Sequence, residues 1–245
     1  MSWAKFAIPI VGTFIGAGLA FLSNLYLQRR IRKQDNMASG YLALLTLRSQ
    51  LDDFLNYRWA VRGGLAKASE TRQGAPAWAL LQPVGFNFNE GNLFEFKSLA
   101  FLLATEAGRG AFQQLQAIQR MYLDLTARHD DLDNSVQEAQ QRLATCEADG
   151  ENRSWDAVEK YLGPELIARV CSQLQNIVIR FDRDEDRYFE AFDMLNAVIG
   201  ENFGGKVKLP RATIPEKYKK AGLPPLPTSL RNFLDLVVGE ENSVI

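Results

Sequence analysis

The hydrophobic pattern of the chain begins with one long uncharged stretch, Phe6 to Leu27, of twenty-two residues. As a helix it would be about 33 Å long, enough to cross a hydrocarbon core of about 30 Å. A cleavable signal peptide would carry positive charge before a shorter apolar stretch, and an amphipathic surface helix would show a polar face. Buried core helices rarely run so long without a charge. The stretch therefore predicts one membrane-spanning helix.

Basic residues lie mainly on the C-terminal side of this stretch. Lys5 precedes it, whereas a cluster of four follows: Arg29, Arg30, Arg32 and Lys33. The positive-inside rule then predicts a single-pass protein with its N-terminus outside and its C-terminal domain in the cytoplasm (at the inner membrane, if the source is bacterial). The same cluster suits anionic lipid headgroups, so membrane lipid is an expected partner.

Small residues recur every four positions within the predicted span, at Gly12, Gly16 and Ala20. Such a stripe lets two helix backbones approach closely. It predicts a helix–helix interface in the membrane, either with another copy of the chain or with a different membrane protein. The alternative is that glycine is simply common in transmembrane helices.

The rest of the chain is dominated by the three-and-four spacing of helices. The pattern predicts helices over 37–72, 93–105, 115–146 and 155–162, and a last long helix from Pro164 to a stop at 202–205. Ser39-Gly40 and Gly63-Gly64 are the expected weak points of the first of these, which could continue directly from the span. Residues 74–92 show no periodicity and predict a long loop. Its aromatic residues could bind a partner or pack back into the core: Trp78, Phe86 and Phe88.

Two long apolar seams with heptad-like spacing indicate an antiparallel, coiled-coil-like hairpin. One runs from Leu115 to Cys146 and the other from Ile167 to Val198. Each contains one polar residue near its middle, His129 and Asp184. An antiparallel register that pairs Leu143 with Val170 also places these two residues opposite each other. We therefore expect a buried polar pair, with the alternative that either residue faces water.

These patterns predict an all-α protein in three parts. Residues 1–35 form the membrane anchor with its basic flank, and residues 36–205 form a helical bundle. Residues 206–245 form a proline-rich arm with a short C-terminal helix, because five prolines fall between Pro210 and Pro227.

Charge and composition exclude some classes of function. Without Lys5 and the basic cluster, 23 basic residues face 29 acidic ones, so a nucleic-acid partner is not expected. The chain has one His and two Cys, too few for a zinc site, a helical di-metal site or most catalytic triads. No phosphate-binding glycine motif is present. We therefore expect neither an enzyme nor a cofactor. One helix edge carries three arginines that predict ion pairs or, alternatively, an acidic or lipid partner: Arg48, Arg58 and Arg62.

The expected function is that of a membrane-anchored interaction protein, a scaffold or a sensor. It would oligomerise or bind a partner through its span and its helical bundle. The alternative is an oligomeric membrane effector, in which copies assemble into a channel or lesion that the bundle gates. A pore lining favours polar residues, and the span offers few of them.

Overall fold

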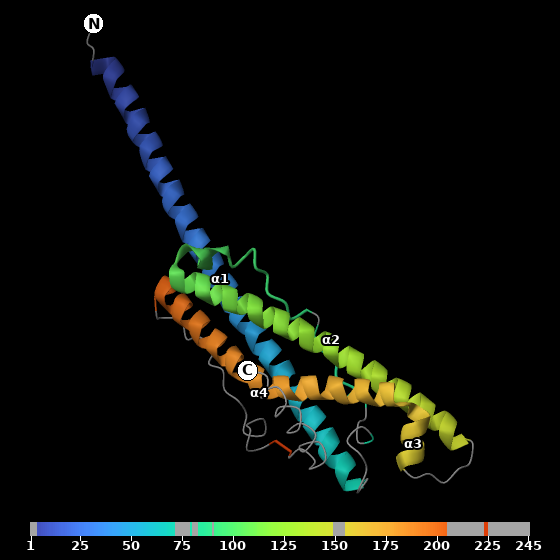
Figure 1. The fold of residues 1–245 in the computed structure, drawn as a ribbon. Coiled ribbons are helices and arrows are strands. Elements are labelled where there is room, and N and C mark those ends of the chain that lie inside the picture. The colour runs from blue at the N-terminus through green and yellow to red at the C-terminus, as the bar shows by residue number, and fades with distance from the viewer. Residues whose placement is uncertain are drawn as a thin grey trace, which may run out of the picture.

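The protein is all-α in a computed structural model, which describes residues 4–71, 79, 83–89, 91–148, 155–204 and 223–224. Side chains of residues 4–14, 146–148 and 155–157 are outside this description. The described elements are α1 (Ala4–Thr71), a 3₁₀ helix η2 (Ala100–Ala104), α2 (Glu106–Ala148), α3 (Trp155–Leu162) and α4 (Pro164–Phe203). Figure 1 shows α2, α4 and the second half of α1 packed together.

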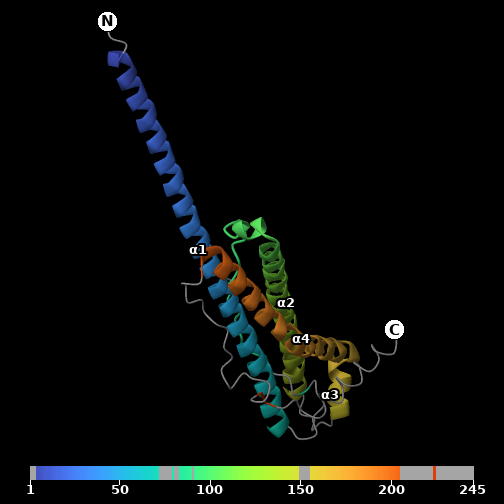
Figure 2. The same ribbon diagram turned by 90° about the vertical axis from the view of Figure 1, so that its left-hand side faces the viewer.

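Helix α1 is one continuous helix of 68 residues, about 100 Å long. Its N-terminal half projects away from the bundle in both views (Figures 1 and 2). The helix passes through Ser39-Gly40 without a break. Gly40 lies where α1 crosses α4, and a Cβ added there would be 3.0 Å from Cδ1 of Ile199. The glycine is therefore a point of close helix packing, where an added methyl group would press on the side chain of Ile199.

The predicted hairpin is confirmed by the packing of α2 against α4. The first seven residues of the α2 seam, from Leu115 to Val136, are buried. The seam is less buried beyond that point, where Ala139 and Leu143 are only partly covered. Helix α4 ends at Phe203, within the predicted stop at 202–205, and Gly204 follows it with a positive φ of 73°.

Helix α4 buries a wider face than its seam predicts. Leu166, Val178, Phe192 and Ile199 lie beside the seam and are also buried. The reason is that α4 packs against α2 on one side and α1 on the other, so it needs an apolar face for each neighbour. Helices α1 and α2 make few direct contacts with each other.

The prediction of a helix over 93–105 is wrong. The chain forms turns at residues 96–99 and then the five-residue η2. Apolar residues are numerous here because they cover the end of the bundle, and Leu99 and Leu102 are buried. A short apolar run cannot by itself separate a helix from an irregular cap.

Among the side chains that the structure describes, no helix has an apolar stretch long enough to cross a membrane. Backbone of the predicted span is helical throughout, whereas the side chains of its first nine residues, 6–14, are outside the description. The C-terminal arm lies outside the described residues except for Leu223, which is buried, and Pro224, which is partly buried.

Candidate functional site

The projecting half of α1 leaves a run of large apolar side chains uncovered among the described residues. Its big side chains are about half or more exposed: Ile15, Leu19, Phe21, Leu22, Tyr26, Leu27 and Ile31. Isolated exposed apolar residues are ordinary, but a contiguous set marks an interaction or membrane surface. Gly16 has open space beside it and Ala20 is exposed, while the side of Gly12 is not described. The stripe is therefore accessible to another helix at the two described positions.

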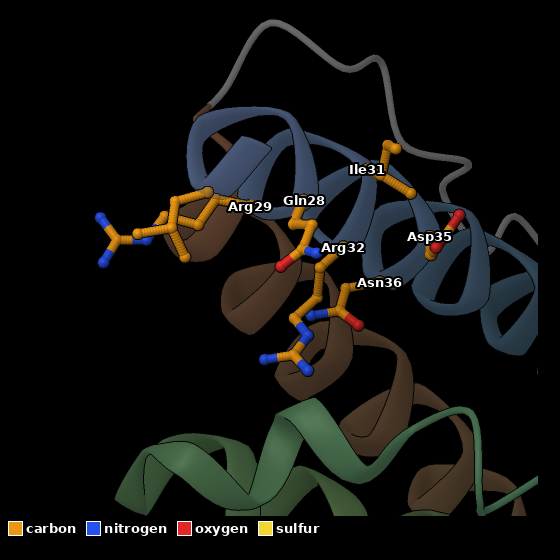
Figure 3. A pocket seen from close by; sticks show the side chains of 7 residues that line it. Gln28, Arg29, Ile31, Arg32, Asp35 and Asn36 are labelled. Carbon is orange, nitrogen blue, oxygen red and sulfur yellow. The ribbon is translucent and has the colours of Figure 1, made fainter. Parts of the chain in front are cut away.

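The basic cluster follows directly where α1 approaches the bundle. All four of its residues are exposed, and no ion pair joins them to another residue in the described part of the chain. A pocket beside the cluster is lined by Leu25, Gln28, Arg29, Ile31, Arg32, Asp35 and Asn36. Figure 3 shows Gln28, Arg32 and Asn36 on the side of α1 towards α4, with Ile31 and Asp35 on another side. Guanidinium and amide groups of this kind can bind phosphate or carboxylate oxygens.

The structure does not form the predicted pair of His129 and Asp184, although both are buried. Nε2 of His129 donates a hydrogen bond of 2.8 Å to the carbonyl of Phe86, and Asp184 accepts one of 2.9 Å from Nε of Arg183. The cause is the register of the hairpin. Arg180 pairs with Asp124 and Arg187 contacts Met121, so Asp184 lies more than one helical turn from His129 along α2.

Residues 83–89 and 91–95, which we call the strap, contact both α1 and α2. Phe88 is buried and Phe86 partly so. Both rings pack on Tyr57 of α1 and His129 of α2, with ring centroids 5.2–6.5 Å apart. Of the two alternatives for these aromatics, the structure shows packing into the core. Trp78 lies outside the described residues.

Polar contacts hold the strap on both helices. Asn92 donates to Oγ of Ser49 (2.6 Å) and to Oδ2 of Asp53 (3.1 Å), both on α1. The hydroxyl of Tyr122 on α2 donates to the same Asp53 oxygen at 2.6 Å and lies 3.2 Å from the carbonyl of Asn89. This network therefore links the strap, α1 and α2 through one carboxylate.

Replacing Tyr122 with phenylalanine is expected to lower the free energy of unfolding by about 2 kcal/mol, because a hydrogen bond to a charged group is lost. Urea unfolding of the detergent-solubilised full chain, followed by circular dichroism, would measure it. Tyr57→Phe is the matched control, because the Tyr57 hydroxyl is buried without a partner among the described residues. Its loss should leave stability unchanged or raise it. Equal losses in the two variants would show that the Asp53 network contributes nothing.

A buried ion pair joins α1 to α4. Nη1 of Arg58 lies 2.6 Å from Oε2 of Glu185, and the exposed fractions of the two side chains are 0% and 6%. The guanidinium also lies over the ring of Phe54, 5.9 Å from its centroid. Arg58 was expected to form an ion pair at a helix edge, but its side chain and that of Glu185 both lie inside the bundle. Their spacing gave the available signal: Arg58 follows Leu51 and Leu55 on one helix face, and Glu185 follows Phe181.

The other two arginines of that helix edge also form ion pairs. Arg62 pairs with Asp182 at 3.3 Å, and Arg48 pairs with Asp52 at 3.0 Å. The salt-bridge interpretation of this edge is therefore confirmed. Burial lowers the pKa of Arg62, partly offset by Asp182.

Burial also raises the pKa values of two groups that lie beside the strap. It raises the pKa of Tyr57 well above its usual range, and Asp133 and Asp130 add to the effect. Burial likewise raises the pKa of Asp133, opposed by His129 and by the backbone N–H of Val84, which donates to Asp133 at 3.2 Å. These groups explain how the strap is held. They include no nucleophile next to a base, the arrangement that covalent catalysis needs.

Within the described residues, no group of His, Cys, Asp and Glu side chains could hold a metal ion. Cys171 is a free, half-buried thiol, and burial raises its pKa, so it is a poor nucleophile.

Comparison with known proteins gives no relative: no protein-family model, no curated protein and no solved structure matches the chain. The features that indicate function are therefore those of the chain itself. They are the exposed apolar half of α1, the basic cluster that follows it, and a bundle whose core is closed by the strap.

Proposed function

We propose that this protein is a single-pass membrane-anchored interaction protein, a scaffold or a sensor. The N-terminal part of α1 inserts in the membrane with its N-terminus outside. The bundle then lies in the cytoplasm, where it binds a partner or assembles with further copies. It works by binding rather than by catalysis.

One observation carries this proposal: a straight helix extends from the bundle and exposes only uncharged residues over 15–27. The sequence continues this uncharged run back to Phe6. In water such a surface would be costly, at about 25 cal/mol for each Å² of apolar area. In a bilayer the helix satisfies its own backbone and the apolar side chains are well solvated.

The basic cluster supports the same arrangement. It begins two residues after Leu27, at the depth where lipid headgroups would start. Juxtamembrane Lys and Arg residues near anionic lipids are each worth about 1 kcal/mol. The net negative charge of the remaining chain agrees with a bundle that stays in the aqueous phase and binds no nucleic acid.

Replacing Leu19 with arginine tests the anchor. A charge at the middle of a spanning helix costs about 2.5–3.5 kcal/mol on insertion scales. We therefore expect a large share of the variant to move to the supernatant when membranes from expressing cells are washed at alkaline pH, while the parent chain stays in the pellet.

Leu123→Arg is the matched control, because Leu123 is also an exposed leucine but lies on the bundle. It should leave the chain in the pellet. A parent chain that is itself extracted by alkali would contradict the proposed anchor.

A further inference from the structure

From the end of its projecting half into the bundle, α1 has one exposed face with regularly spaced, mostly apolar residues. Alternating steps of four and three residues connect Leu27, Ile31, Gln34, Ala38, Tyr41 and Leu45. All six are exposed, and the large apolar ones remain 41–53% exposed. We call these six residues the outer seam. Steps of four and three are the signature of helices that pack in coiled coils.

The outer seam lies away from the face with which α1 contacts the bundle. That inner face is formed by fully buried residues such as Leu44, Leu47 and Leu51. At 100° per residue the centres of the two faces are roughly 150° apart. Figure 3 agrees, because Ile31 lies on a different side of α1 from Arg32 and Asn36, which point towards α4. A second helix on the outer seam would therefore leave the bundle intact.

Charges beside the outer seam suit a second copy of the same helix. In heptad terms Arg30 lies at a g position and Asp35 at the following e position. In a parallel pair of helices these two positions face each other across the interface, so that Arg30 of each copy meets Asp35 of the other. Neither residue has an ion-pair partner among the described residues. An antiparallel pair would not bring them together in this way.

We propose that α1 pairs with α1 of a second copy, parallel and in register, along the outer seam. The parallel direction rests on the proposed function, because membrane anchoring holds both N-termini on the same side. Gln34 is the one polar member of the seam, and two such amides can hydrogen-bond each other across the two-fold axis. A single polar residue at a core position fixes register at some cost in stability.

The length of the outer seam explains why the membrane matters for this pairing. Nineteen residues from Leu27 to Leu45 make about two and a half heptads, which is marginal for a coiled coil in water. Beyond Leu45 the same spacing reaches Arg48 and Asp52, which pair with each other, and the apolar seam ends. Anchoring both copies in one bilayer raises their effective concentration and favours the pair.

Cysteine cross-linking in isolated membranes tests the pairing in the full chain. The background carries Cys146→Ser and Cys171→Ser. Ile31→Cys and Ala38→Cys place thiols in the seam, where the Cβ atoms of paired helices come within disulfide reach of about 4 Å. Arg29→Cys is the matched control, because it lies on the opposite side of the helix. We expect mild oxidation to convert both seam variants to dimers and the control at least about fivefold less.

A charge exchange provides the second measurement. Arg30→Asp alone should reduce cross-linking at Ile31→Cys by about three- to tenfold, because two attractive pairs become repulsive. Adding Asp35→Arg should restore it. A matched exchange on the inner side, Arg32→Asp with Asn36→Arg, should change it little.

Failure of the pairing and failure of the anchor give different results. Equal cross-linking at residues 29 and 31, or none at either, overturns the pairing, and equal cross-linking is the pattern expected of a ring of many copies. In both cases the chain still resists alkaline extraction if the anchor is right. A chain that is extracted by alkali but still cross-links only through the seam supports the pairing and overturns the anchor.

Discussion

Replacing Arg58 with alanine is expected to destabilise the bundle by about 3–5 kcal/mol. The variant leaves the carboxylate of Glu185 buried at the α1–α4 interface without its bidentate partner, whose Nη1 and Nη2 lie 2.6 and 3.4 Å from it. It also removes the guanidinium from the ring of Phe54. Chemical unfolding of the detergent-solubilised chain measures the loss. A loss below about 1 kcal/mol would show that water reaches Glu185 and that the pair is not buried in solution.

Two controls separate the broken pair from the lost volume. The double variant Arg58→Met, Glu185→Leu replaces the pair with apolar groups of similar size and should cost far less than Arg58→Ala, or nothing. Arg48→Ala removes a partly exposed ion pair with Asp52 and should cost less than about 1 kcal/mol. If the double variant is as unstable as Arg58→Ala, the pair itself contributes net stability or determines how α1 and α4 pack.

Replacing Gly108 with alanine is expected to destabilise the protein by about 3 kcal/mol, although alanine normally favours a helix over glycine. A Cβ at this position would lie 2.0 Å from the carbonyl oxygen of Leu102 and 2.8 Å from Oγ1 of Thr105. The first clash is with backbone, so no side-chain rotation relieves it. The turn from η2 into α2 must shift, and with it the buried Leu102.

Gly63→Ala is the matched control in the same measurement. No atom lies within 4 Å of the added Cβ, so the change should stabilise the protein by about 0.5–1 kcal/mol through helix propensity alone. Stabilisation of both variants would contradict the close approach at Gly108. A loss in Gly108→Ala with a gain in Gly63→Ala would place the steric constraint at the η2–α2 junction.

The hairpin illustrates what residue spacing predicts well. Helices α3 and α4 begin and end where the pattern placed them, and α2 extends the predicted seam. Apolar periodicity encodes which face of a helix is buried, because every third or fourth side chain lies on one side. It does not encode register. His129 and Asp184 are both inside as predicted, yet they bind Phe86 and Arg183 instead of each other.

The strap and the buried ion pair show why the rest could not be predicted. The strap has no regular spacing of apolar residues, and its position depends on distant polar groups such as Asp53 and Tyr122. Arg58 looks like a surface residue in the sequence, because nothing local reveals a carboxylate that is 127 residues away. Pairings of this kind arise only when three helices close around a common core.

The sequence by itself determined the all-α class, the helices of the hairpin, and one uncharged N-terminal stretch followed by a basic cluster. Local spacing and charge are sufficient for these features, since each depends on residues within a few turns of one another. Only the tertiary structure decided that α1 is a single helix with two opposite faces. It also decided that Gly40 and Gly108 are close contacts, that Arg58 is buried, and which residues of α1 remain exposed. These features depend on what packs against a helix from elsewhere in the chain, and no local pattern contains that information.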